Sequence, residues 1–273
     1  MSMEYYQIPP QRLGEGARLP IVKCESSEAA FEALACEMCA VIRENNAADR
    51  RTVLICPVGP VGQYPFFVRQ VNEERLSLKN CWIINMDEYL TDDGEYIDMQ
   101  SPLSFRGFMA REVYGKIDPD LLMPEEQRVF PDPADPGKVT ALIEELGGVD
   151  ACFGGVGITG HLAFNEPQPA LTVEEFSRLT TRVLDIAPET RATNCIGDLG
   201  GALEALPRKC VTVGMKEILS ANKLRLAVFR DWHRAVCRRA AYGDVTAAFP
   251  VTIAQNHPDA VLYVNNIAAE QPF

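Results

Sequence analysis

Residues 149–167 read VDACFGGVGITGHLAFNEP, an apolar run that passes directly into a glycine-rich segment. The run 149–155 is apolar or small at nearly every position, with no regular polar alternation. That pattern is typical of a strand buried on both faces, as in a parallel sheet. The segment that follows holds His161 and the carboxylate Glu166. The stretch therefore predicts a buried strand whose carboxyl end carries a loop with reactive side chains.

Similar runs recur along the chain, with helical patterns between them. The other strand-like runs are RTVLICP (51–57), WIINM (82–86), KCVTVGM (209–215), LRLAVF (224–229) and AVLYV (260–264). Helices are predicted over 26–45, 65–72, 136–146 and 231–242, with Ser26 capping the first and glycines ending the last two. This alternation predicts an α/β fold: an open, mostly parallel, Rossmann-like doubly wound sheet with helices on both faces, in a single domain over 1–273.

In such sheets ligands bind at the carboxyl ends of the strands. Three segments follow predicted strands: PVGPVGQYP (57–65), DEYL (87–90) and GGVGITGHLAFNEP (154–167). In the first, Gly59 and Gly62 can bring backbone N–H groups close to an anion. Its three prolines remove three donors, so a stiff strand–helix connection is the alternative interpretation.

Two of these segments carry side chains suited to proton transfer. Asp87 and Glu88 follow a buried run, and partial burial would raise the pKa of Asp87 into the range of a general base. A solvated loop acid is the alternative. His161 can donate or accept a proton near neutral pH, and Glu166 can orient it. A structural histidine is the alternative there, but the glycine flanks and the strand-end position favour a functional role.

The composition restricts the partners of the protein. The formal net charge is -12, which repels nucleic acid and anionic membranes, so neither is expected as a partner. Any anion site must therefore be locally basic. The start, MSMEYYQIPPQ, lacks the features of a signal peptide, and no apolar run reaches the ~18 residues of a membrane span.

The cysteines indicate the compartment. There are nine, an odd number, and several lie within apolar runs, which predicts buried free thiols in a reducing environment and a cytoplasmic location. Cys36 and Cys39 form a CxxC inside a helical pattern. Without a second pair or a nearby histidine, core thiols are the better interpretation than a redox or metal site.

The strings NMDEY (85–89) and GHLAFNEP (160–167) resemble the glucosamine-6-phosphate deaminase/isomerase family, which shares its fold with 6-phosphogluconolactonases and ribose-5-phosphate isomerases. The lactonase branch resembles GHxAS at the second string, so AFNEP points to the deaminase branch. Further matches follow in order: SRLTTRV (177–183), ETRATN (189–194), TVGMKEILSA (212–221) and HPDAVLYV (257–264). The resemblance therefore runs from about residue 27 to 266.

The resemblance implies an enzyme of Rossmann-like topology that converts an amino-sugar 6-phosphate to the ketose phosphate plus ammonia, without a metal or organic cofactor. The sugar ring opens, a carboxylate moves a proton between C2 and C1 through an enol-type intermediate, and the amine leaves. By motif, Asp87 inherits the role of the base, His161 assists ring opening, and Glu166 belongs to the same relay. Since the family often forms homo-oligomers, the resemblance also implies a homo-oligomer as a candidate assembly.

The sequence departs from the family pattern at two places. The family usually has Asp two residues before the histidine, and here Thr159 removes the carboxylate that fixes the histidine tautomer. The loop 57–65 lacks the Ser or Thr of the family's phosphate loop. The family's phosphate-site lysine falls near His233, beside Arg230 and Arg234, whereas Arg238 and Arg239 are interpreted as solvated helix charges. The substrate-binding candidates are Gly59, Gly62, Glu88, Gly155, Gly157, Thr159, Gly160, Arg182 and His233.

Three hypotheses follow. The first is an isomerase/deaminase of a hexosamine phosphate that uses Asp87, His161 and Glu166. The second is a member with a shifted substrate, such as another amino sugar or an unphosphorylated sugar, motivated by Thr159 and the altered loop. The third is a binding protein without catalysis. A hydrolase similar to the 6-phosphogluconolactonases is a further alternative to the first.

Overall fold

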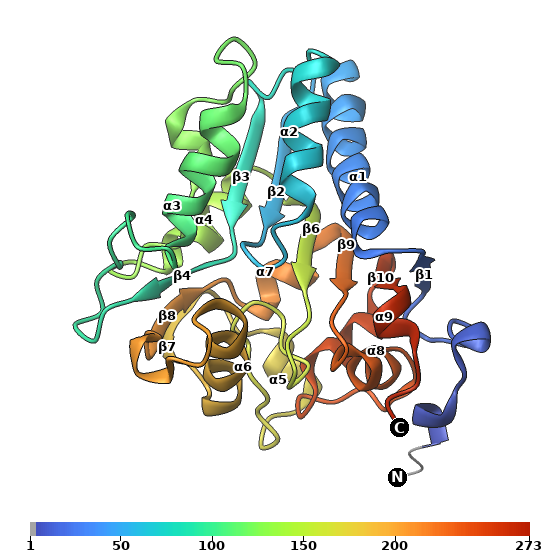
Figure 1. The fold of residues 1–273 in the computed structure, drawn as a ribbon. Helices are drawn as coiled ribbons and strands as arrows, with labels where there is room; N and C mark the ends of the chain where they lie inside the picture. Colours follow the sequence, from blue (N-terminus) through green and yellow to red (C-terminus); the bar gives the residue numbers. More distant parts are fainter. Residues whose placement is uncertain (1–3) are drawn as a thin grey trace.

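Seven parallel strands form the central sheet, in the order β1-β10-β9-β6-β2-β3-β5 (Figure 1). They are β1 (Ile21–Cys24), β2 (Thr52–Cys56), β3 (Cys81–Asn85), β5 (Arg128–Val129), β6 (Val149–Gly155), β9 (Ala221–Val228) and β10 (Ala260–Asn265). The computed structural model describes residues 4–273, with the backbone alone at Asp198. Residues 1–3, where the segment without signal-peptide features starts, lie outside the described part. The predicted open parallel α/β sheet is confirmed.

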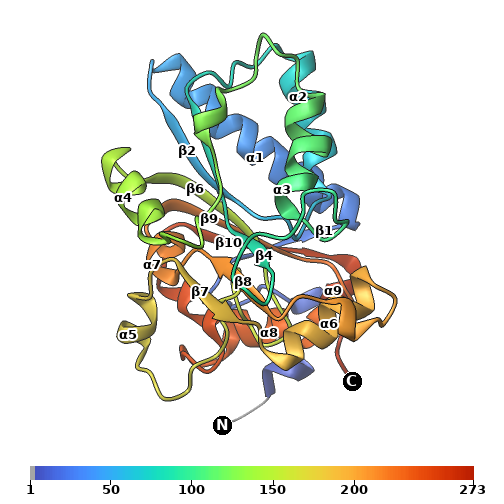
Figure 2. The same cartoon turned by 90° about the vertical axis from the view of Figure 1, so that its left-hand side faces the viewer.

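Helices cover both faces of this sheet. They are α1 (Ser27–Ala47), α2 (Gln63–Glu73), α3 (Phe105–Phe108), α4 (Gly137–Glu145), α5 (Val173–Ser177), α6 (Pro188–Asp198), α7 (Met215–Leu219), α8 (His233–Tyr242) and α9 (Asn266–Ala269). Helices α1 and α2 lie over one face of the sheet, and α7 and α8 lie over the other (Figure 2). The side chains of α1 and α2 form one apolar core with the sheet, and those of α4, α7 and α8 form another. The sheet is therefore buried on both sides, which explains its near-continuous apolar runs.

The four predicted helices are present, with small shifts at their ends. Ser26 caps α1, and its hydroxyl accepts a hydrogen bond from the backbone N–H of Ala29 at 3.0 Å. The helix α2 starts at Gln63, two residues before the predicted Pro65. Gly243 ends α8 as predicted. Helix boundaries shift by a residue or two because end turns are held by few hydrogen bonds.

The prediction that KCVTVGM belongs to the parallel sheet is wrong. Its residues 209–212 form β8 (Lys209–Thr212), the middle strand of a separate antiparallel sheet with β4 (Asp87–Leu90) and β7 (Arg182–Asp185). A small apolar cluster with Tyr89, Phe164 and Cys210 covers this sheet. An apolar run indicates that a strand is buried. It does not indicate whether that strand pairs parallel or antiparallel with its neighbours. The segment DEYL, predicted as a strand-end loop, is likewise a strand of this small sheet, β4.

The interpretation of Arg238 as a solvated charge is also wrong. Arg238 is fully buried and donates hydrogen bonds to the carbonyls of Ile8, Arg234, Ala269 and Glu270. It therefore joins the N-terminal segment, α8 and the C-terminal segment, and both ends of the chain lie on that side of the molecule (Figure 1). Its neighbour Arg239 stacks on Phe249, with the guanidinium carbon 4.1 Å from the ring centroid.

All nine cysteines are free thiols, and most are buried in the cores. Cys36 is the exposed member of the CxxC, and Cys39 is buried. The core-thiol interpretation therefore holds for Cys39, whereas Cys36 lies at the surface near the amide of Gln70. Within residues 4–273, no helix is long and apolar enough to cross a membrane, and no three acidic, cysteine or histidine side chains are grouped to hold a metal ion.

Candidate active site

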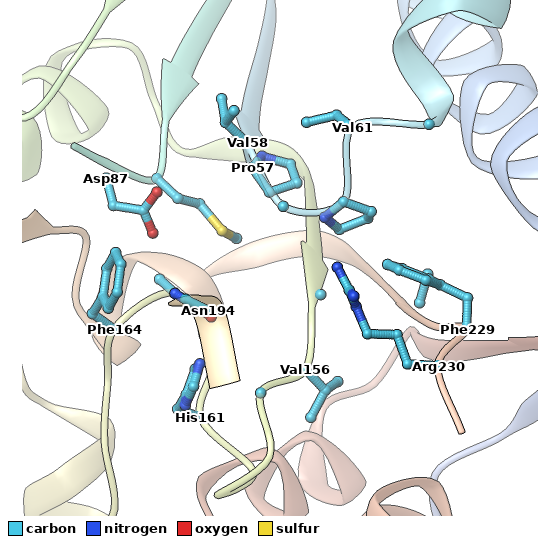
Figure 3. Close-up of a pocket in the computed structure, with 18 of the residues that line it drawn as sticks. Pro57, Val58, Val61, Asp87, Val156, His161, Phe164, Asn194, Phe229 and Arg230 are labelled. Carbon is cyan, nitrogen blue, oxygen red and sulfur yellow. The ribbon is translucent and has the colours of Figure 1, made fainter. Parts of the chain in front are cut away.

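A pocket of about 390 Å³ opens where four strands of the central sheet end (Figure 3). The loops after β2, β3, β6 and β9 all contribute to its wall, and α1 and α6 add side chains from the sides. This is the convergence at strand ends that the sequence predicts. Of the residues proposed from the sequence, the wall contains Gly59, Gly62, Asp87, Gly155, Gly157, His161 and His233.

Asp87 lies directly after the short turn between β3 and β4, and its carboxylate faces the pocket (Figure 3). Its residue is only 7% exposed. Burial, with a smaller contribution from the charge of Glu88, raises the pKa of Asp87 to about 8. No described residue donates a hydrogen bond to it. An unpartnered carboxyl group that titrates near neutral pH has the properties of a general base.

The adjacent carboxylate of Glu88 has a structural role. It accepts hydrogen bonds from the backbone N–H groups of Tyr89, Phe105 and Arg106 and from the hydroxyl of Ser104. Glu88 is fully buried and is not part of the pocket wall. Successive strand residues point to opposite sides, so Glu88 points away when Asp87 points in. The sequence suggests a substrate-binding role for Glu88. The structure does not support that role, because Glu88 lies outside the pocket wall.

His161 is held by a network of hydroxyls and a carboxylate on its Nδ1 side. Nδ1 lies 2.9 Å from the hydroxyl of Thr159, 3.2 Å from that of Thr190 and 3.3 Å from Glu166 Oε2. The hydroxyl of Thr159 also donates to Glu166 Oε2 at 2.8 Å, and Thr190 donates to the other carboxylate oxygen. A proton on Nδ1 is satisfied by this arrangement, which leaves Nε2 facing the pocket.

Glu166 lies behind His161 and outside the pocket wall. Burial would raise the pKa of its carboxyl, but the contacts with His161, Thr190 and Thr159 outweigh this and lower it. Glu166 is therefore an anion beside the imidazole. Thr159 and Gly160 lie with it behind the histidine, so their contact is with His161 and its loop rather than with the cavity.

Glycines allow the loops to approach each other closely here. A Cβ on Gly157 would lie 1.9 Å from the ring of His161, and one on Gly155 would lie 2.8 Å from the carbonyl oxygen of Gly59. Gly160 has φ +79°, and a Cβ there would also meet the ring of Phe249. Side chains at these positions would displace the histidine or separate the loops after β2 and β6.

The far end of the pocket is aromatic, with one guanidinium. Phe31 from α1, Phe229 and Trp232 line it, together with Arg230 at the end of β9. His233 lies beneath, with both ring nitrogens in use: Nδ1 accepts from the N–H groups of residues 229 and 230, and Nε2 contacts the carbonyl of residue 156. Burial lowers the pKa of His233 to about 4, so it is neutral and cannot replace a lysine as a cation.

Arg182 and Arg234 lie outside the pocket wall. The guanidinium of Arg182 donates to the side chain of Asn165 and to the carbonyl of Thr180. Arg234 donates to the carbonyl of Ile267. The substrate-binding role proposed for Arg182 is therefore not supported by its position, because its donors hold the small sheet to the loop after β6.

Three residues of the site were not among the sequence candidates: Phe31, Thr190 and Asn194. Thr190 and Asn194 lie on α6, within the family-like string ETRATN, and Asn194 donates to the hydroxyl of Tyr89 at 3.0 Å. Arg230 follows a predicted strand, so the strand-end rule identifies it. Phe31 has no such signal, because it lies on the first turns of α1, far from any strand end in sequence.

The fold belongs to the class shared by amino-sugar phosphate deaminases and lactonases. A solved monomeric glucosamine-6-phosphate deaminase superposes with a TM-score of 0.79 at 23% identity, over 91% of this chain and 98% of that one. A 6-phosphogluconolactonase from Shewanella baltica superposes with a TM-score of 0.63 at 14% identity, over 90% and 97%. No family model matches the chain.

Curated relatives identify the branch. A glucosamine-6-phosphate deaminase of Rhodopirellula baltica is 31% identical over 215 residues, which covers 77% of this chain and 79% of the relative. One from Clostridium perfringens is 29% identical over 221 residues, with 77% and 83% covered. The chain therefore belongs to the glucosamine-6-phosphate deaminase family.

Proposed function

We propose that the protein is an amino-sugar deaminase/isomerase, for which the sequence-based expectation is a hexosamine phosphate such as glucosamine 6-phosphate. One observation carries this proposal: an unpartnered, buried carboxyl group, Asp87, and the free Nε2 of His161 face the same pocket. Family membership supports the reaction class. Asp87 can act as the base that removes a proton from carbon, and Nε2 of His161 can carry a proton to or from oxygen.

His161 acts first, at the ring. Opening a pyranose requires a proton at the ring oxygen and loss of one from the C1 hydroxyl. Nε2 can carry that proton, because Nδ1 is already held by Thr159, Thr190 and Glu166. The anionic Glu166 stabilises the imidazolium that forms when Nε2 takes up a proton. Glu166 and the hydroxyls of Thr159 and Thr190 together hold Nδ1 of His161, a role that the hydroxyl of Thr159 could not fill alone.

Asp87 then acts on carbon. In its ionised form it removes the proton from C2 of the open-chain amino aldehyde, the electron pair forms the C1–C2 double bond of an enolamine, and the C1 oxygen takes up the proton that the substrate ammonium group gives up. The same carboxyl returns the proton to C1, which gives an imine at C2. Water adds to the imine carbon and ammonia leaves, so the products are the ketose and ammonia. The substrate ammonium group, an opposite charge beside Asp87, favours the ionised carboxylate in the complex.

The alternatives have less support. A binding protein without catalysis has no need for a carboxyl group held unpartnered in an apolar wall at a cost in stability. The likeness to 6-phosphogluconolactonases is a likeness of fold, and no observation in the pocket favours ester hydrolysis over proton transfer at carbon.

The test is an assay of ammonia release and ketose formation with glucosamine 6-phosphate and a panel of amino-sugar, aldose and ketose phosphates and their unphosphorylated forms. Reactions run in D₂O report proton transfer directly, because exchange at Asp87 places solvent deuterium at C1 of the ketose. The Asp87→Asn protein is the control. If no sugar in the panel is converted and none exchanges deuterium, the proposed function is wrong.

A further inference from the structure

Helix α6 brings an amide side chain to the wall of the pocket, beside the histidine. In the first turn of α6, the hydroxyl oxygen of Thr190 lies 3.2 Å from Nδ1 of His161. Asn194 follows four residues later, so it lies on the same face of the helix, about 6 Å further along its axis. Its Nδ2 donates a hydrogen bond to the hydroxyl of Tyr89 at 3.0 Å. The amide is therefore fixed between the histidine network and β4.

Tyr89 connects this amide to the other reacting group. Tyr89 and Asp87 are two residues apart on β4, so their side chains point to the same side of that strand. Both line the pocket, as Asn194 does. In the view of Figure 3, the side chain of Asn194 lies between those of Asp87 and His161. The part of a sugar that contacts both reacting groups therefore lies next to this amide.

The carbonyl oxygen of Asn194 is available to a ligand. The contact with Tyr89 determines the orientation of the amide, because Nδ2 is the atom that faces the tyrosine hydroxyl. Among the residues that the structure describes, none donates a hydrogen bond to Oδ1 of Asn194, and Oδ1 is not enclosed in the interior. The side chain lines the cavity. Oδ1 is therefore a hydrogen-bond acceptor without a protein donor in the described part of the chain.

The other polar side chains of the described wall are less suited to bind a donor group of the ligand. They take part in the reaction (Asp87 and His161), are already hydrogen bonded (Tyr89 and His233), or carry only donors (Arg230 and Trp232). Within the described wall, Oδ1 of Asn194 is thus the one side-chain oxygen or nitrogen acceptor that the proposed reaction does not use.

An amino sugar requires an acceptor of this kind. An ammonium group at C2 carries three N–H donors and no acceptor, and a buried donor without a partner costs free energy. A hydroxyl group at C2 can donate or accept, so it depends less on one acceptor. An amide oxygen also accepts a hydrogen bond without taking the proton. It can therefore hold the nitrogen as the ammonium group, as the enolamine and as the imine.

We propose that Asn194 binds the amino group at C2 of the substrate and determines the preference for an amino sugar over a 2-hydroxy sugar. The inference rests on the proposed function for the position of C1 and C2 between Asp87 and His161. It assigns no proton transfer to Asn194, so the atoms of the reaction remain the same.

The test is equilibrium binding, near neutral pH, of two ligands that differ only at C2: 2-amino-2-deoxyglucitol 6-phosphate and glucitol 6-phosphate. Both are open chains without an aldehyde, so neither is converted during the measurement. The wild type should bind the amino ligand at least about tenfold more tightly, as expected for a hydrogen bond to a charged group. Equal affinities, or tighter binding of glucitol 6-phosphate, would overturn the proposal.

Variants separate Asn194 from Asp87, whose charge also favours the amino ligand. Asn194→Leu keeps a similar side-chain size without the carbonyl oxygen, so the preference for the amino ligand should fall about tenfold. Asn194→Asp places an anion there and should increase the preference. Thr193→Val, next to Asn194 on α6, is the matched control and should keep the wild-type preference, because its hydroxyl contacts only the carbonyl of Glu189.

The ratio of the two affinities distinguishes recognition from a structural role. A variant that is partly unfolded loses affinity for both ligands alike, so its ratio does not change. An unchanged ratio in Asn194→Leu, or a lower ratio in Asn194→Asp, would overturn the proposal.

The outcome is also separate from the proposed function, because neither ligand is a substrate. Loss of the amine preference in Asn194→Leu, with no ammonia released from any sugar of the panel, would refute the reaction alone. Ammonia release by the wild type, with an unchanged amine preference in Asn194→Leu, would refute the role of Asn194 alone.

Discussion

The two ends of the pocket are held in different ways. At the reaction end, every polar atom behind His161 has a partner: Thr159, Thr190 and Glu166 contact its Nδ1 and one another. At the other end, the guanidinium of Arg230 donates to no described residue, and its neighbours in the pocket wall include Phe229 and Trp232. The first end is a completed network that fixes one geometry. The second is an unmatched charge that the ligand completes.

This difference supports the proposal that one end of the pocket carries the reaction and the other carries the choice of substrate. The reaction end retains the family-like strings NMDEY and GHLAFNEP. Its one departure is Thr159, whose hydroxyl donates a hydrogen bond to Glu166. The recognition end departs in the loop 57–65, and the ring of Phe31 packs against Gly62 of that loop. Substitutions at the reaction end should therefore change kcat, and substitutions at the recognition end should change KM.

The largest effect is expected for Asp87→Asn. An amide cannot accept the proton from C2, so kcat should fall by about 10³-fold while the fold and ligand binding persist. The measurement is steady-state ammonia release together with a binding isotherm for the same protein. If the variant keeps full rate, another group is the base and the reaction end has been misassigned.

The next effect compares two glycine substitutions, one at each end. Gly157→Ala pushes a Cβ into the ring of His161, and displacing a reacting group by about 1 Å costs on the order of 10²-fold in kcat. Gly62→Ala pushes a Cβ into the ring of Phe31 and should act mainly through KM. Full kinetic curves for both variants test this. A kcat loss for Gly62→Ala as large as that for Gly157→Ala would contradict the division of the pocket.

Thr159→Val should have a smaller effect, confined to kcat. It removes a hydrogen bond to the anionic Glu166, worth about 1.5 kcal/mol or roughly tenfold in rate. Thr159→Ser should restore most of the loss. Thr193→Val on α6, whose hydroxyl contacts only the carbonyl of Glu189, is the matched control. If Thr159→Val and Thr193→Val lose the same activity, Thr159 does not position the histidine.

The pH dependence of turnover should separate the free enzyme from its complex. Because Asp87 acts ionised and burial raises its pKa to about 8, kcat/KM should rise with pH and level off above that value. The limb in kcat should lie at lower pH, since the bound ammonium group favours the carboxylate. Coincident limbs in the two profiles would mean that the substrate amine does not lie beside Asp87.

Much of the sheet and half of the site could be predicted from the sequence, for reasons that particular residues show. The runs 51–57 and 149–155 are strands because burial on both faces leaves an apolar trace, and Asp87 and His161 lie at strand ends. The direction of 209–212 could not be predicted, because burial is the same in either orientation. The sequence also could not show that the side chain of Asp87 points into the pocket and that of Glu88 points away, because this depends on where β4 begins.

The position of Phe31 in the pocket wall also could not be predicted from the sequence. On α1 it reads as one more apolar position of an amphipathic helix, in the same pattern as Leu34 and Met38. Its contact with Gly62 depends on how α1 and α2 pack, which no local pattern reports. For the same reason the sequence could indicate that the loop 57–65 departs from the family pattern, and could not indicate that an aromatic ring packs against Gly62.

The last expected effect is on how stability changes with pH, and it tests whether Asp87 is held protonated. The pKa of Asp87 is raised from 3.8 to about 8 in the folded protein, so between these values the folded state keeps a proton that the unfolded state has lost. Its contribution to stability is fully present below pH ~4 and is lost as pH rises to ~8. Asparagine has no such proton, so the stability of Asp87→Asn relative to wild type should grow by at most about 1.4 kcal/mol per pH unit over that interval and then stay constant.

Denaturant unfolding of both proteins at several pH values between 4.5 and 9 measures this difference. The exposed Asp93→Asn is the matched control, because it makes the same Asp-to-Asn change at the surface instead of in the wall of the pocket. A pH-independent difference for Asp87→Asn would mean that the carboxyl is ionised at little cost in the folded state. It would then be paired, like the groups behind His161, and the contrast between a satisfied histidine and an unsatisfied acid within the reaction end would no longer hold.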